Sequence, residues 1–163
     1  MIIPTQTTVR EVMTADPITV KPDTPLSSAI ETMAKRSISG IPVVDESSHL
    51  LGVISEAELM WQESGVDMPP YIMLLDSVIY LENPANYERD LHKALGQQVK
   101  DAMTDKMTTV SPEESLRDAA RLMHRKEVSR LIVVDSSGGG SKVVGVITRG
   151  DVIRYMASHQ DEA

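Results

Sequence analysis

The sequence of this chain contains one motif written twice, with a constant offset of 90 residues between the copies. After a turn rich in Gly and Ser, the offset becomes 93 residues because the second copy is longer there. Matching segments are Val9–Thr14 with Val99–Thr104, Gly40–Asp45 with Arg130–Asp135, and Leu51–Leu59 with Val144–Val152. Such a repeat predicts two copies of one folding unit that bury their apolar faces together.

Composition limits the core that these copies can build. Within the 163 residues there is no Phe, one Trp and four Tyr, so Val, Ile, Leu and Met must supply most of the buried surface. Each copy alone is too short to bury its apolar face well, whereas two copies packed together can do so. We therefore expect an aliphatic core shared by the pair.

Several classes of protein are excluded by charge and residue content. The formal net charge of −8 argues against binding a nucleic-acid polymer, although a single nucleotide needs only one or two local cations. Cysteine is absent, which removes disulfides and thiolate metal sites. The N-terminus lacks a secretory signal, and the longest apolar run, Tyr71–Leu81, is interrupted by Asp76. We expect a cytoplasmic protein that does not bind a membrane.

Each copy reads as extended, helical, extended, turn, extended and helical segments. In the first copy the expected elements are a strand at Ile18–Val20, a helix at Pro25–Lys35, strands at Ile41–Val44 and Leu51–Ile54, and a helix from Ser55. The second copy repeats this order with strands at Ile132–Val134 and Val143–Ile147. Its run Gly138–Gly140 predicts a hairpin turn, since it lacks the Lys and helix of a phosphate-binding loop.

A segment without a counterpart separates the copies. Asn83 and Pro84 look like a helix start, and Tyr87, Leu91 and Leu95 would share one helical face. We expect a helical insertion here. The predicted organisation is a first repeat at 1–60, the insertion at 61–98, a second repeat at 99–158 and a tail at 159–163.

The ordered set of paired motifs resembles a tandem pair of CBS domains, also called a Bateman module. The similar elements are the VREVMT and VKDAMT segments, GIPVVD and RLIVVD, and the GVIS and GVIT strands followed by SEAE and TRGD. The resemblance implies an α/β (α+β) fold, with two β-α-β-β-α repeats packed with pseudo-twofold symmetry. It also implies clefts for adenosyl ligands, and a homodimer formed through helices near Met33 and Met123.

Thr148 and Asp151 are the strongest candidates for ligand chemistry. Thr148 follows a predicted strand and opens a helix, where its hydroxyl and the first free amides can bind an anion. Asp151 lies one turn further, and its carboxylate can accept hydrogen bonds from both cis hydroxyls of a ribose. The alternative is a capping box, which uses the same spacing. Ser55 and Glu58 fit that alternative better, because Glu58 is one methylene longer than the usual Asp.

The resemblance implies further site residues in each copy. With Thr148 and Asp151 it places Asp16, Pro17, Ile18, Ile38, Ser39, Gly40, Ile41, Arg130, Val146 and Arg149. A weaker mirror site would use Val53, Ser55, Glu58, Lys106, Met107, Val128 and Ser129. Apolar side chains would face the purine, and Arg130 has a planar guanidinium that suits a phosphate. A surface arginine is the alternative interpretation of Arg130.

These observations favour a regulatory module over an enzyme. No catalytic constellation can be assembled, and the scattered His49, His92, His124 and His159 predict no metal site. We expect a sensor of AMP, ADP or ATP that needs no cofactor and acts on a separate, unknown protein. The alternatives are a ligand-free interaction scaffold, and a binder of another adenosyl ligand such as S-adenosylmethionine or NAD.

Overall fold

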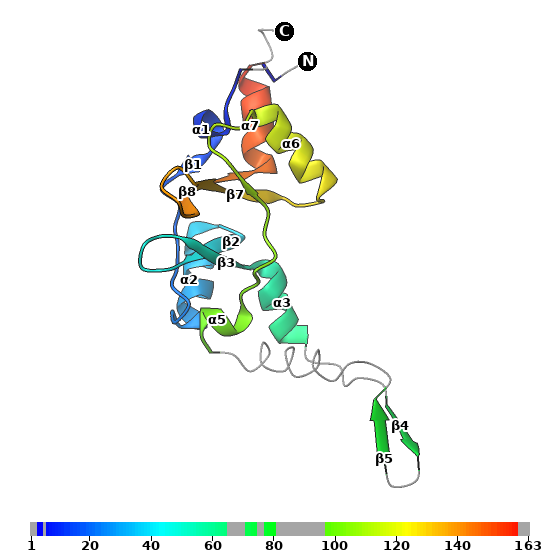
Figure 1. The fold of residues 1–163 in the computed structure, drawn as a ribbon. Helices are drawn as coiled ribbons and strands as arrows, with labels where there is room; N and C mark the ends of the chain where they lie inside the picture. The colour runs from blue at the N-terminus through cyan, green and yellow to red at the C-terminus, as the bar shows by residue number, and fades with distance from the viewer. Residues whose placement is uncertain (1–2, 5, 65–70, 75–76, 81–96, 160–163) are drawn as a thin grey trace. The chain divides into compact units, whose positions relative to one another are not determined.

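A computed structural model describes residues 3–4, 6–64, 71–74, 77–80 and 97–159 of the chain (Figure 1). It contains two compact units. The first comprises Met1–Thr19, Pro42–Gly52 and Asp105–Ala163, and the second comprises Val20–Ile41 and Val53–Thr104. The units cut across the repeats, because the first residues of each copy belong to the unit that holds most of the other copy.

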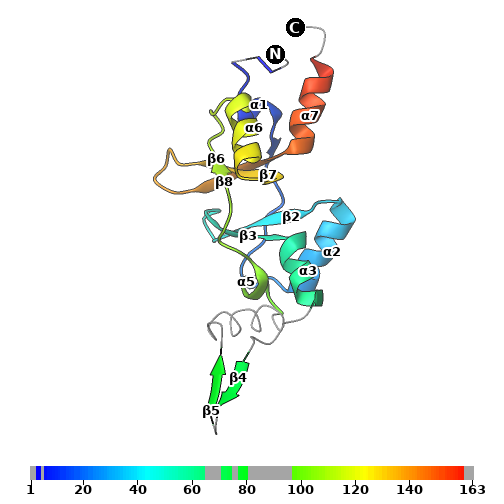
Figure 2. The same ribbon diagram turned by 90° about the vertical axis from the view of Figure 1, so that its right-hand side faces the viewer.

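The first unit is built on a four-stranded sheet with the order β1-β8-β7-β6. β6 and β7 are parallel, while β7 and β8 form an antiparallel hairpin and β1 pairs antiparallel with β8. Helices α1, α6 and α7 lie on one face of this sheet (Figure 2). The elements are α1 (Val9–Val12), β1 (Thr14–Ala15), β6 (Thr109–Val110), α6 (Leu116–Arg125), β7 (Arg130–Asp135), β8 (Lys142–Thr148) and α7 (Arg149–Ser158).

The core of the first unit lies between this sheet and its helices. On α6, Leu116, Ala119 and Met123 follow the helical period and are buried. They pack with Val9 of α1 and Ile147 of β8, both fully buried. Complete burial of one aliphatic side chain of this size contributes about 1.5–3 kcal/mol. The aliphatic core expected from composition is therefore present.

A hairpin tip from the first copy joins the same unit. Val44 forms a buried cluster with Ile132 and Val143 of the β7–β8 hairpin. The Leu50 amide donates to the Ser141 carbonyl at 2.9 Å, so the two hairpins are also linked through their backbones. This packing keeps β7 and β8 covered where they approach their turn.

The second unit repeats the local arrangement of the first. It comprises α2 (Leu26–Arg36), α3 (Glu56–Ser64), β4 (Tyr71–Leu74), β5 (Ser77–Tyr80), α5 (Val99–Ala102) and parts of the β2–β3 sheet, with β2 at Gly40–Val44 and β3 at Leu50–Ser55. The Val99 amide donates to the Thr24 carbonyl at 2.9 Å, just as the Val9 amide donates to the Glu114 carbonyl at 2.9 Å. The α/β (α+β) fold with two repeats is confirmed.

One expected strand is wrong. Ile18 and Thr19 are not in a strand and Val20 is only a single bridge residue, whereas the strand of this segment is β1 at Thr14 and Ala15. Asp16 has a positive φ of 46°, which turns the backbone away from an extended path. The following Pro17 has no amide to donate to a sheet, so the strand cannot continue.

The insertion also departs from the expectation. β4 and β5 form an antiparallel pair in which Tyr71 lies opposite Tyr80, so the expected helical structure is wrong for these strands. Their residues are mostly aromatic or β-branched, which favours strands, and a short apolar run does not distinguish strand from helix. The helix predicted over Tyr87–Leu95 lies outside the described residues. In the described part of the chain, no helix combines the length and apolar content needed to cross a membrane.

Candidate functional site

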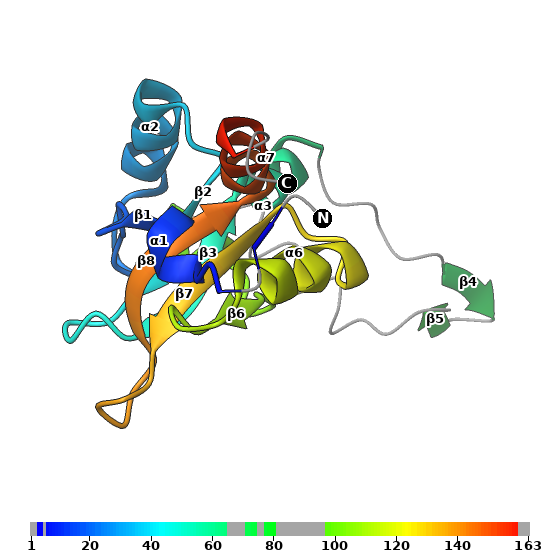
Figure 3. The same cartoon turned by 90° about the horizontal axis from the view of Figure 1, so that it is seen from above.

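The candidate site is built on the junction between β8 and α7 (Figure 3). Thr148 is the last residue of β8, where it pairs with Arg130 of β7, and its backbone is extended with φ −118° and ψ 164°. α7 begins at the next residue. The first amides of a helix have no partners within the helix, so this junction presents donors at the positive end of the helix dipole.

Thr148 and Asp151 form a reciprocal capping box at this junction. One carboxylate oxygen of Asp151, Oδ2, accepts from the Thr148 amide at 2.7 Å and from the Thr148 hydroxyl at 2.7 Å. The Asp151 amide in turn donates to the Thr148 hydroxyl oxygen at 3.2 Å. The Asp151 side chain is only 11% exposed. The capping alternative considered from the sequence is therefore realised, and ribose binding by Asp151 stays a prediction.

A further contact at Asp151 was missed from the sequence. Nη2 of Arg154, one turn further along α7, contacts Oδ1 of Asp151 and forms an ion pair with it. The Arg154 side chain is 74% exposed. The spacing of three residues between an acidic and a basic residue on a helix is the signal that could have found this pair.

The equivalent junction in the first copy, between β3 and α3, is capped in the same way, but the acidic residue is the longer Glu58. Oε2 of Glu58 accepts from the Ser55 amide at 3.0 Å and also from the Ser55 hydroxyl. This is the capping role that the sequence favoured for Ser55 and Glu58. Among the described residues, Glu58 makes no ion pair that corresponds to the one between Asp151 and Arg154.

Backbone contacts of the first unit connect several other predicted residues to β8 or to the start of α7. The Arg149 amide donates to the Ser129 carbonyl at 3.0 Å, and the Asp16 amide donates to the Val144 carbonyl at 3.3 Å. Val146 pairs with Thr14 across β1 and β8. These contacts place Arg130 and Arg149 beside Thr148, whereas Asp16 contacts β8 at Val144, four residues earlier.

The remaining predicted residues have varied exposure. Ile18 is 39% exposed, whereas Ile41 is fully buried and offers no side-chain surface. Ile38, Ser39 and Gly40, which lie in the second unit, are partly exposed. Of the weaker set, Val53 is buried, Met107 and Val128 are half-buried, and Lys106 and Ser129 are exposed.

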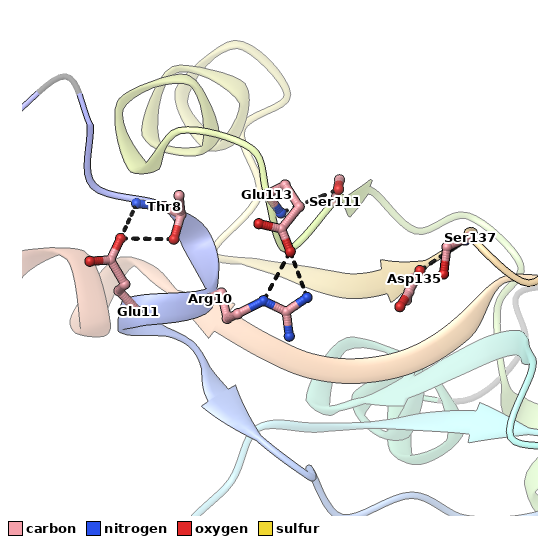
Figure 4. Close-up of polar contacts among 7 residues, drawn as sticks. All are labelled: Thr8, Arg10, Glu11, Ser111, Glu113, Asp135 and Ser137. Carbon is pink, nitrogen blue, oxygen red and sulfur yellow. Dashed lines mark hydrogen bonds and ion pairs between the residues drawn. The ribbon is translucent and has the colours of Figure 1, made fainter.

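Other carboxylates of the first unit have structural roles around α1 (Figure 4). Arg10 donates from Nε and Nη2 to Oε1 of Glu113, at 3.0 and 2.6 Å, and so ties α1 to the segment before α6. Glu11 accepts from the Thr8 amide at 2.6 Å, and this hydrogen bond holds the pKa of Glu11 below its usual value. These groups stabilise the start of α1.

Equivalent aspartates close the two hairpin turns. Oδ1 of Asp135 accepts from the Ser137 amide at 2.8 Å, and Oδ1 of Asp45 accepts from the Ser47 amide at 2.8 Å. The pKa of Asp135 is lowered first by its hydrogen bond with the Ser137 side chain, and the pKa of Asp45 first by the His49 amide. Such Asx turns explain why both copies have Asp at the end of their matching strands.

A hollow of about 240 Å³ lies beside α6, lined by Val110, Glu114, Asp118, Ala119, Arg121, Leu122 and Arg125. It shares no residue with the predicted sites. Within the described ranges, no group of three or more His, Asp or Glu side chains is arranged to hold a metal ion.

Comparison with known proteins assigns the family. The CBS domain family model matches residues 9–63 and 99–158. CBSX1, a chloroplastic CBS domain-containing protein of Arabidopsis thaliana, is 36% identical over 153 residues, covering 90% of this chain and 63% of that protein. An uncharacterized protein of Methanocaldococcus jannaschii is 31% identical over 150 residues, with 86% of both chains covered. This chain thus spans less than two thirds of the length of CBSX1.

The solved structures agree with this assignment. A crystal structure of CBSX2 in complex with AMP has a TM-score of 0.75 and 32% sequence identity, covering 96% of this chain and 99% of that chain. The ranges matched by the family model include both junctions, at Ser55 and at Thr148. The chain belongs to the CBS domain family and carries a tandem pair of CBS domains.

Proposed function

We propose that this protein is a regulatory module that binds an adenine nucleotide, AMP, ADP or ATP, and performs no chemistry on it. The observation that carries the proposal is the start of α7, where Thr148 and the mostly buried carboxylate of Asp151 lie together at the positive end of the helix dipole. The AMP complex of CBSX2, a relative with 32% identity, supports an adenine nucleotide as the ligand.

In this proposal the parts of the nucleotide are recognised by different groups. The ribose hydroxyls donate to Asp151, and a phosphate is attracted by the positive end of the α7 helix dipole. Arg130, which stands opposite Thr148 on β7, adds positive charge for the phosphate. The purine contacts Ile18, which is 39% exposed.

Binding would regulate a separate protein through a shift between arrangements of the chain. A ligand changes such an equilibrium only by its difference in affinity for the two states. We propose a homodimer as the regulated assembly, in the cytoplasm. Met33 and Met123 are buried within the chain, but Ile30, Met60 and Ile153 are 44%, 61% and 62% exposed on α2, α3 and α7. These exposed side chains support a helix-mediated contact with a second copy.

The experiment is calorimetric titration of the protein with AMP, ADP and ATP, followed by S-adenosylmethionine and NAD. We expect one adenine nucleotide to bind, and Asp151→Ala to weaken that binding by at least tenfold because a charged hydrogen-bond acceptor is lost. Asp118→Ala is the matched control. Asp118 caps α6 through Ser115 as Asp151 caps α7 through Thr148, so this variant loses a cap without touching the proposed site.

A ligand-free scaffold is the second candidate, and one observation favours it. Both carboxylate oxygens of Asp151 already have partners within the chain, Thr148 and Arg154. These structural contacts explain an aspartate at this position without any ligand. A thermal-shift measurement separates the two candidates. Ligand at one hundred times its dissociation constant stabilises a binding protein by about 2.7 kcal/mol, whereas a scaffold shows no shift with any of these ligands.

A further inference from the structure

Arg154 occupies the carboxylate that the proposed function assigns to the ribose. We propose that Arg154 competes with the sugar for Asp151 and thereby sets the affinity of the site. This inference rests on the proposed function and adds a residue that determines how tightly the ligand is held. It begins from the ion pair between Nη2 of Arg154 and Oδ1 of Asp151.

The acceptor capacity of Asp151 explains the competition. An ionised carboxylate has about four lone-pair positions for hydrogen bonds. Three donors already reach Asp151: the amide and the hydroxyl of Thr148 at Oδ2, and Arg154 at Oδ1. Two ribose hydroxyls need two positions, and only one remains. One of the present donors must therefore leave when the sugar binds.

Arg154 is the donor that can leave most readily. The two bonds from Thr148 are local and close the first turn of α7, so their loss would weaken the start of the helix. The Arg154 side chain is 74% exposed and can exchange the carboxylate for water. Because the Arg154 side of the ion pair is exposed to water, the competition is modest and amounts to a few-fold in affinity.

The helix α6 carries the same layout and supplies a control. Ser115 hydrogen-bonds with Asp118, and Nη1 of Arg121 lies 3.1 Å from Oδ1 of Asp118. The Asp118 side chain is 52% exposed, against 11% for Asp151. A capping aspartate paired with an arginine three residues later therefore occurs without any ligand site. Competition with a ligand arises only where the same carboxylate also binds the ligand.

The first copy lacks this arginine. With the offset of 93 residues, position 154 corresponds to Trp61, so the carboxylate of Glu58 faces no cation from the equivalent position in the sequence. The inference therefore concerns the α7 junction alone. It predicts that charge removal at position 154 changes one site and leaves the mirror site unaffected.

The test measures adenosine binding by calorimetry, because adenosine has the ribose but no phosphate that Arg154 could attract. We expect Arg154→Gln to bind adenosine about two- to fivefold more tightly than the wild-type protein, which is the fold-change for an exposed ion pair. Arg121→Gln is the matched control and should bind like wild type. Raising the salt concentration should tighten adenosine binding to the wild-type protein but not to Arg154→Gln, since salt screens the ion pair.

The outcomes separate this inference from the proposed function. If Arg154→Gln binds adenosine more weakly than, or equally to, the wild-type protein, Arg154 does not compete and the inference is overturned. If neither protein binds adenosine, AMP, ADP or ATP, the proposed function fails and the inference fails with it. Binding by Arg154→Gln alone would support both. Thermal melts of each variant check that the fold is retained.

Discussion

The β8–α7 junction and the β3–α3 junction have the same backbone arrangement but are capped by different acidic residues, Asp151 and Glu58. At both, a strand ends in a hydroxyl residue whose amide and side chain donate to a carboxylate three residues later. Glu58 reaches Ser55 with a longer side chain than Asp151 uses to reach Thr148. A helix start can therefore be capped by an aspartate or by the longer glutamate. The difference in side-chain length between Asp151 and Glu58 matters only for a further role of the carboxylate, such as binding a ligand.

A second comparison concerns the short helices α1 and α5. Each begins with hydrogen bonds from its first amides to the loop before a longer helix, α6 for α1 and α2 for α5. Val9 and Val99 are equivalent and fully buried. Each copy thus donates its first helix to the unit that holds most of the other copy, so neither unit is complete within one repeat of the sequence.

The largest expected effect tests whether the cores of the two copies are equivalent. Ile54 and Ile147 occupy matching positions, and both are fully buried. We expect Ile54→Ala and Ile147→Ala each to lower the free energy of unfolding by about 2–5 kcal/mol, because each leaves a cavity. Urea denaturation measures this cost. Ile→Val at either site should cost about 0.5–1.5 kcal/mol, and an alanine variant as stable as wild type would contradict the packing.

The next largest effect concerns α1 and α5, each of which belongs to the unit that holds most of the other copy. Val9→Ala should cost about 2 kcal/mol and should lower amide protection in α6, α7 and β8, which belong to the same unit as α1. Val99→Ala should instead lower protection in α2 and α3. Hydrogen exchange read residue by residue distinguishes the two patterns. If Val9→Ala lowered protection mainly in α2, the assignment of α1 to the first unit would be wrong.

Exchanging the two acids sharpens the comparison of the junctions. If the proposed function holds, Asp151→Glu should weaken nucleotide binding about tenfold, since a longer side chain displaces the oxygens from the sugar. Glu58→Asp should strengthen binding at the weaker site, which calorimetry would record as a second binding event. Glu56→Asp, also in the first turn of α3, serves as the control. Unchanged binding in both swapped variants would show that the acid length does not matter.

The smallest effect is a pH dependence at α6. The pKa of Asp118 is lowered, first by the Ser115 hydroxyl and further by Arg121. A carboxylate with a lowered pKa stabilises the folded state above its unfolded pKa of about 3.9, and this stabilisation is lost as the pH falls through the lowered value. Asp118→Asn should therefore melt below the wild-type temperature at pH 7. The difference should shrink as the pH falls below the unfolded value and vanish below the lowered pKa, and a constant difference would contradict the sign.

Much of the fold could be predicted from the sequence because the evidence was local and repeated. The spacing of Leu116, Ala119 and Met123 marks the buried face of α6, and the β-branched run in RLIVVD marks β7. The strand at Ile18–Val20 was misplaced because the conformation of Asp16 is not visible in its residue type. At the candidate site, the pairing of Thr148 with Asp151 was predictable from their spacing alone.

Sequence by itself determined the repeat, the order of elements within each copy, the aliphatic core and the capped helix starts, since each depends on residues near one another in the chain. Tertiary structure alone decided that α1 and α5 are exchanged between units and that Ile41 is buried. These depend on which surfaces meet and on the rotamers that packing leaves available. No local pattern of residue types contains that information.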